Sequence, residues 1–184
     1  MKHFILFTGH MIDAKDRQAP RFPAHKEEKA RREIKLRLFH KKLIIESPLQ
    51  GIASGACGGD ILFHEICVQL GVPSEIYLPV PPEEFKKGSV SFAGKQWDER
   101  FDKLLKQLPY YVLPENEGDA ASMNIYERTN EWMLEKALVN GGKNMSLIAL
   151  WDGGGGDGKG GTKGMINMTR EKGAAVGIID IKKI

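Results

Sequence analysis

The sequence predicts an α/β protein in which helices cover both faces of a mainly parallel sheet of about six strands, giving three layers. Short apolar runs bounded by Gly, Pro or Asp alternate along the chain with stretches of helical periodicity. The 184 residues, 41% of them hydrophobic, suffice to bury one sizeable core. Since no internal repeat and no long linker divides the chain, we expect residues 1–184 to form a single domain.

Six segments are expected to form strands because each is a short apolar run that ends at turn-forming residues. They are residues 3–9, 51–56, 74–80, 110–115, 146–152 and 174–180. Strands that alternate with helices pair in parallel through right-handed crossovers, so the sheet is covered on both faces. The expected fold is therefore a Rossmann-like sandwich.

Helical periodicity is found between these runs. Apolar residues recur at helical intervals in residues 24–44, 60–70, 97–108 and 126–139, and a further helix is expected after residue 162. In residues 24–44, which are rich in Lys, Arg and Glu, the recurring apolar residues are Leu36, Phe39 and Leu43.

Composition narrows the possible partners. A net charge of +3 is far from the dense basic field that makes nucleic-acid binding a default, so nucleic acid is an unlikely partner and small anions fit better. Cys57 and Cys67 are not accompanied by a second Cys/His pair at zinc-finger spacing, and we expect no metal site. The opening apolar run is too short for a signal peptide, and no run approaches a membrane span. We therefore expect a reduced, cytoplasmic setting with no membrane contact, and homo-oligomerisation stays open.

Three polar or glycine-rich segments follow predicted strands: TGHMID (8–13), SGACGGD (54–60) and WDGGGGDGKGGT (151–162). In open parallel sheets, ligands bind beyond the carboxyl ends of the strands, where loops lead into helix N-termini. We therefore expect these three segments to border a ligand site.

The early turn, SGACGGD, has the chemistry of a phosphate site. Gly55, Gly58 and Gly59 lack the Cβ atoms that would keep a ligand from the backbone, and the helix that follows offers unpaired N–H groups. Asp60 stands where an N-cap residue would, either as a cap alone or as an orienting group within a ligand site. The turn does not match G-x-G-x-x-G, so a standard NAD-dependent dehydrogenase is not expected.

We expect that the late turn is not a linker, because the sequence predicts one short helix and one short strand after it and not a second folded unit. Gly160, Gly161 and Thr162 stand at a predicted helix N-terminus, where backbone amides and a hydroxyl can hold an anion. The order of residues is not that of a P-loop. Asp152 and Asp157 either bind a ribose hydroxyl or an ion, or simply turn the chain.

The first segment places Gly9 and His10 at the end of the first strand. His10 either contacts a phosphate or a base, or has no ligand role. Beyond Asp13, Arg17 and Arg21 lie in a long loop that is either a lid presenting guanidinium groups to phosphate or a solvated loop.

Other residues have two interpretations each. Glu65 is either a second carboxylate of a hydrolytic site or, as its spacing from Asp60 favours, structural. Tyr126 and Asn130 share a helix face and either border the pocket, with Tyr126 stacking on a base, or belong to the core, which is favoured for Tyr126. Cys57 is expected to be a small buried spacer rather than a nucleophile.

The pair of turns, SGACGGD early and GDGKGGT late in one Rossmann-like sheet, resembles the SLOG superfamily. This superfamily includes the Lonely Guy cytokinin-activating phosphoribohydrolases, the DNA-processing protein A fold and nucleotide-sensing modules of bacterial defence systems. The resemblance runs from about Phe4 to Ile181. It implies that both turns converge on one nucleotide-type ligand, with Gly160, Gly161 and Thr162 as the late phosphate turn.

The chain departs from the enzymes of that superfamily at one position. Lonely Guy enzymes carry P-G-G-x-G-T-x-x-E, and Met165 stands where the glutamate would be. We therefore expect binding or sensing of a nucleotide or nucleotide-derived ligand, in a bacterial defence or signalling system. The alternative is a nucleotide N-glycoside hydrolase or transferase with Asp60, Glu65 or Asp152 as its carboxylate. A scaffold subunit is a third possibility, which leaves the glycine turns unexplained.

Overall fold

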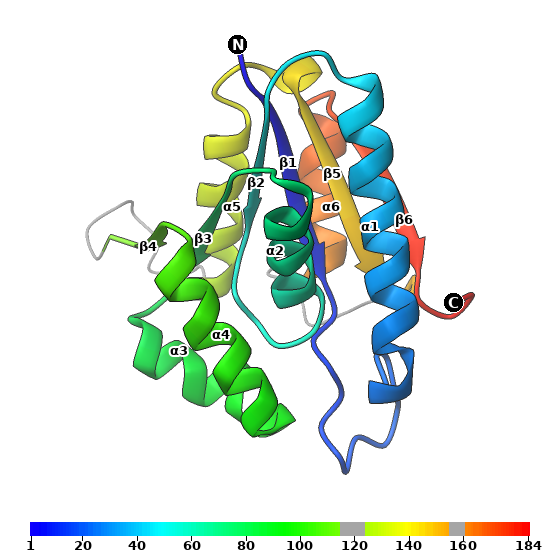
Figure 1. The fold of residues 1–184 in the computed structure, drawn as a ribbon, viewed down its shortest axis with the longest axis vertical. Coiled ribbons are helices and arrows are strands. Elements are labelled where there is room, and N and C mark those ends of the chain that lie inside the picture. Colours follow the sequence, from blue (N-terminus) through cyan, green and yellow to red (C-terminus); the bar gives the residue numbers. More distant parts are fainter. Residues whose placement is uncertain (115–123, 155–160) are drawn as a thin grey trace.

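The computed structural model describes residues 1–114, 124–154 and 161–184. Within them, six strands form one sheet in the order β4-β3-β2-β1-β5-β6, and every neighbouring pair is parallel (Figure 1). The strands are β1 (His3–Gly9), β2 (Leu49–Ala53), β3 (Ser74–Leu78), β4 (Tyr110–Val112), β5 (Met145–Trp151) and β6 (Ala175–Asp180). The prediction of a Rossmann-like α/β sandwich with a six-stranded parallel sheet is confirmed.

Helices lie on both faces of the sheet (Figure 1). They are α1 (Glu27–Ile44), α2 (Gly59–Leu70), α3 (Pro82–Ser89), α4 (Lys95–Gln107), α5 (Ile125–Ala137) and α6 (Thr162–Glu171), with short 3-10 turns at Ala24–Lys26, Ser91–Ala93 and Gly142–Asn144. In Figure 1, α1 and α2 lie in front of the sheet and α5 and α6 behind it. Helix α3 is not among the helices expected from the sequence.

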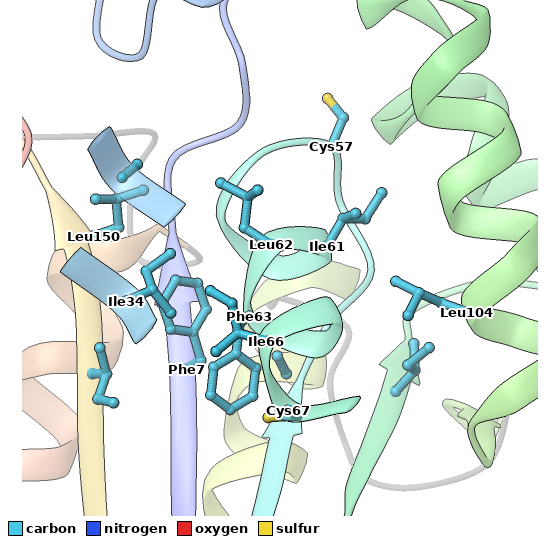
Figure 2. Packing of buried hydrophobic residues seen from close by; sticks show 14 of the residues in the cluster. Phe7, Ile34, Cys57, Ile61, Leu62, Phe63, Ile66, Cys67, Leu104 and Leu150 are labelled. Carbon is cyan, nitrogen blue, oxygen red and sulfur yellow. The ribbon is translucent and has the colours of Figure 1, made fainter. Parts of the chain in front are cut away.

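Strand β1 contributes side chains to two cores because successive residues of a strand point to opposite faces. Ile5 and Phe7 are buried with residues of α1, α2 and α4, while Leu6 is buried with residues of α5 and α6. The Phe7 ring stacks on Phe63 of α2, with ring centroids 4.9 Å apart (Figure 2). This stack fixes the start of α2 beside the carboxyl end of β1.

The apolar stripe expected for α1 lies on the wrong face. Leu36, Phe39 and Leu43 are 52%, 46% and 68% exposed. A second apolar stripe, with residues about one helical turn apart, faces the core instead: Ala30, Ile34 and Leu38. Both stripes have helical spacing, so periodicity alone does not decide which one faces the sheet.

Candidate functional site

A cavity of about 430 Å³ opens at the carboxyl edge of the sheet. Its wall combines the end of β1, the segments that lead from β2 into α2 and from β5 into α6, and residues of α3 and α5. A volume of this size suits a small-molecule ligand. Five of the residues expected from the sequence to form a ligand site line it: Gly9, His10, Asp60, Gly161 and Thr162.

His10 connects three segments of the cavity wall. Its backbone N–H donates to the Leu150 carbonyl at 3.1 Å, and its own carbonyl accepts from the Gly59 N–H at 3.1 Å. Its ring Nε2 lies 3.0 Å from Oδ1 of Asp152. The backbone nitrogen of Asp152 lies 3.2 Å from the same Nε2. The tautomer of the ring decides whether Nε2 donates to the Asp152 carboxylate or accepts from the Asp152 N–H, and either bond holds the imidazole against Asp152.

Asp152 supports the site without lining the cavity. Burial acts to raise the pKa of its carboxyl, but hydrogen bonds from the Gly154 N–H and from His10 outweigh burial, and the pKa lies below its usual value. The Gly154 N–H donates to Oδ1 at 2.8 Å, two residues along the chain, so the carboxylate also turns the loop after β5. Asp157 and Gly160, which were also expected at this loop, lie outside the described residues.

The glycines of the α2 turn make room for the protein's own chain. Gly58 has φ +102°, and a Cβ there would lie 2.7 Å from a backbone nitrogen of the loop after β1. A Cβ on Gly59 would lie 3.0 Å from the Phe7 ring, and one on Gly55 would lie 2.8 Å from the Phe101 ring. None of these three glycines lines the cavity, so the close approach that they permit is between segments of the protein.

Asp60 is not the N-cap of α2. The helix begins at Gly59 with Gly58 as its N-cap, which makes Asp60 the second helical residue. Its side chain lines the cavity, the residue is 7% exposed, and Oδ2 accepts a hydrogen bond from the Ala56 N–H at 3.3 Å. Burial raises the pKa of the carboxyl to about 7, although the Ala56 N–H acts in the opposite direction.

The structure brings in His64, a residue that sequence reasoning missed. It is fully buried on α2, with Nε2 at 3.0 Å from the Ser54 carbonyl and Nδ1 at 3.1 Å from the Ser74 hydroxyl. Burial lowers its pKa to about 4, so the ring is neutral near pH 7 and Nε2–H donates to Ser54. His64 therefore positions Ser54 in the cavity wall. Its signal in the sequence is a histidine that directly follows the apolar run Ile61–Phe63 of the expected helix.

The loop after β1 is held by Asp13. Its carboxylate accepts from the backbone N–H groups of Arg21 and Phe22, both at 2.9 Å, and lies 3.4 Å from Nε of Arg17. Phe22 is fully buried and anchors the end of the loop. Arg21 lines the cavity, whereas Arg17 does not and donates instead to the Ala19 carbonyl. Of the two arginines considered for a phosphate lid, only Arg21 reaches the cavity.

Glu65 lies away from the cavity, on the outer side of α2. Its carboxylate lies 2.7 Å from Nη2 of Arg31 and 2.7 Å from Nε of Arg100, and Arg100 also contacts Glu27. These ion pairs join α1, α2 and α4. The geometry fits the structural interpretation of Glu65 rather than the catalytic one.

Helix α5 supplies an aromatic and amide wall. Tyr126 and Asn130 line the cavity, and the Tyr126 residue is 48% exposed, so the expectation of a core tyrosine is wrong. Phe85 of α3 also lines the cavity. Trp151 at the end of β5 lines it too, and among the described residues its buried Nε1–H has no hydrogen-bond acceptor.

Cys57 and Met165 occupy positions where reactive groups were considered. The Cys57 thiol is buried, and burial raises its pKa to about 12, which fits an inert spacer rather than a nucleophile. Met165 is fully buried in the core behind the sheet and does not line the cavity. Met165 occupies the position at which Lonely Guy enzymes carry a glutamate, and that position therefore does not face the cavity.

Within the described ranges, no group of three His, Cys, Asp or Glu side chains could hold a metal ion. No helix of those ranges is both long and apolar enough to span a membrane. Comparison of the chain with protein-family models, curated proteins and solved structures finds no match.

Proposed function

We propose that the protein binds a nucleotide or nucleotide-derived ligand in the cavity at the carboxyl edge of the sheet. The position of the cavity, at the point where the strand order reverses, carries the proposal. The chain runs outward from β1 through β2, β3 and β4, then returns to the other side of β1 as β5, so the order of the strands reverses between β1 and β5. His10 and Asp152 pair across that switch point, where open α/β sheets bind their ligands.

One wall of the cavity suits a phosphate. Gly161 and Thr162 bring the N-terminus of α6 to it, and helix N-termini favour anions through unpaired N–H groups and the helix dipole. Arg21 and His10 also line the cavity. A phosphate there would receive a charge-assisted hydrogen bond from Arg21 in addition to those from the helix N-terminus.

Another part of the lining suits a base. The half-exposed Tyr126 offers a ring on which an aromatic base can stack, Phe85 adds apolar contact, and Asn130 carries an amide with both donor and acceptor atoms. Together with the resemblance to SLOG proteins, this supports a sensor of a nucleotide signal in the bacterial cytoplasm.

The second candidate function is hydrolysis or transfer at a nucleotide N-glycosidic bond. Asp60 favours it, because a buried carboxyl in a cavity with a pKa of about 7 has the properties of a general acid. We nevertheless expect incubation with AMP, NAD and ADP-ribose to release no free base or nicotinamide above background. Turnover that disappears in Asp60→Asn would instead establish the hydrolase.

Isothermal titration with AMP and adenosine tests the binding proposal. Arg21→Ala should weaken AMP about tenfold, since a charge-assisted hydrogen bond typically contributes about 1.5 to 3 kcal/mol, and should leave adenosine nearly unchanged. Arg17→Ala is the matched control from the same loop and should change neither affinity. Equal losses for both ligands in Arg21→Ala, or no binding of either ligand by the parent, would overturn the proposal.

A further inference from the structure

The two glycine-rich turns present different groups to the cavity. At the start of α2, the Gly59 N–H donates to the His10 carbonyl and the Ile61 N–H to the Ala56 carbonyl. At the start of α6, the first N–H with an acceptor in the described part of the chain is that of Met165. The α6 turn therefore offers the N–H groups of residues 162–164 to an anion, whereas in the first turn of α2 the N–H groups of Gly59 and Ile61 are already used and only that of Asp60 has no acceptor among the described residues.

Asp60 makes the α2 turn unsuitable for a phosphate. Its carboxyl stands in the first turn of α2 and lines the cavity, where an ionised form would repel an anion. A carboxylate has about four acceptor positions, and in the described ranges the Ala56 N–H is the only hydrogen-bond donor to it, while no Lys or Arg forms an ion pair with it. Asp60 is 7% exposed and faces the cavity, so its carboxyl keeps unused acceptor positions. Hydrogen-bond donors of a ligand can fill them.

The two turns flank the end of β1. Strands β2 and β5, which lead into α2 and α6, are both direct neighbours of β1. Neighbouring strands lie about 4.8 Å apart, so the ends of β2 and β5 are about 10 Å apart across β1, and one small ligand at that edge can lie between the two turns. Gly9, at the end of β1 between them, carries no side chain that would fill this space.

We infer that the two turns take different parts of one ligand: the α6 turn holds the phosphate, and Asp60 on the α2 turn accepts hydrogen bonds from the ribose hydroxyls. This inference rests on the proposed nucleotide function and deepens it. It makes the protein selective for ribonucleotides, and it assigns one phosphate-binding turn where the sequence predicts two.

Isothermal titration with AMP and 2′,3′-dideoxy-AMP tests the assignment. The parent should bind AMP about tenfold or more tightly than the dideoxy analogue, because two hydroxyls are missing from the latter. Asp60→Asn should lower AMP affinity about tenfold and leave the analogue within about twofold. Asp60→Ala should show the same loss of selectivity, and Glu65→Gln, on the same helix but outside the cavity, should show none.

The sign of the Asp60→Asn effect separates the alternatives. If the α2 turn held the phosphate, removal of the negative charge would strengthen binding of both ligands, and that result would overturn the inference. Unchanged or equally weakened binding of both ligands would overturn it as well. If the parent bound AMP without preferring it to the analogue, the inference alone would fail, whereas a parent that bound neither ligand would defeat the proposed function itself.

Discussion

The α2 turn and the α6 turn are both rich in glycine and both border the cavity, yet the protein uses them differently. In the α2 turn, Gly58 and Gly59 allow the loop after β1 to pack against the start of the helix. In the α6 turn, Gly161 and Thr162 line the cavity. A glycine-rich sequence after a strand therefore indicates a close approach, but does not say whether a ligand or the chain itself approaches.

The largest loss of stability is expected from Gly58→Ala. The substitution forces a side chain into a φ of +102° and brings its Cβ to 2.7 Å from a backbone nitrogen. Strain and overpacking together should lower the free energy of unfolding by about 4 kcal/mol, measured by urea denaturation. Gly71→Ala is the matched control, because Gly71 also has a positive φ of +64° but has nothing within 4 Å of the new Cβ. Equal losses in the two variants would show that the α2 turn is not tightly packed.

Asp60→Asn should stabilise the protein at high pH. Burial raises the pKa of this carboxyl from 3.8 to about 7, so the folded state binds the proton more tightly than the unfolded state. Its contribution to stability is therefore complete below pH 3.8 and is lost as the pH rises through 7. We expect Asp60→Asn to raise the free energy of unfolding by about 4 kcal/mol at pH 8 and to change it much less at pH 4.

Denaturation at the two pH values, with the exposed Asp16→Asn as control, measures this difference. If Asp60→Asn stabilised the protein equally at pH 4 and pH 8, the ionised form of Asp60 would not be what destabilises the folded state. A destabilisation at pH 8 would mean that a protein group, rather than a ligand, satisfies the carboxylate.

A smaller effect is expected at the α6 turn. Gly161 has φ −89° and ψ 178°, an extended conformation that valine adopts without strain. Gly161→Val should keep the fold but place a branched side chain beside the proposed phosphate, weakening AMP about tenfold while adenosine changes little. Calorimetric titration and a melting curve measure both quantities. Unchanged AMP affinity in the folded variant would remove the α6 turn from the site.

Most of the fold follows from the sequence because strands and helices alternate with clear periodicity. Helix α3 is the exception. Pro81 and Pro82 are residues that often end a helix, and the helix itself is only eight residues long. Pro82 in fact occupies the first helical position, with Glu83 and Glu84 in the first turn and Lys86 and Lys87 in the last, a charge pattern that complements the helix dipole.

The location of the cavity is predicted from topology, because ligands bind where parallel strands end and their order reverses. The roles of single residues are harder to predict. Asp60 and Glu65 are both acids of one helix, but only the packing of α1 and α4 shows that Glu65 is held by two arginines. His64 and Ser54 are joined by a hydrogen bond between the end of β2 and the interior of α2, which no local pattern encodes.

A crystal structure of the protein with AMP tests the central claim most directly. The account predicts the phosphate within hydrogen-bond distance of the Thr162 and Lys163 N–H groups, with a ribose hydroxyl donating to the Asp60 carboxylate. A phosphate at the start of α2 beside Asp60, or AMP bound outside the cavity, would contradict it.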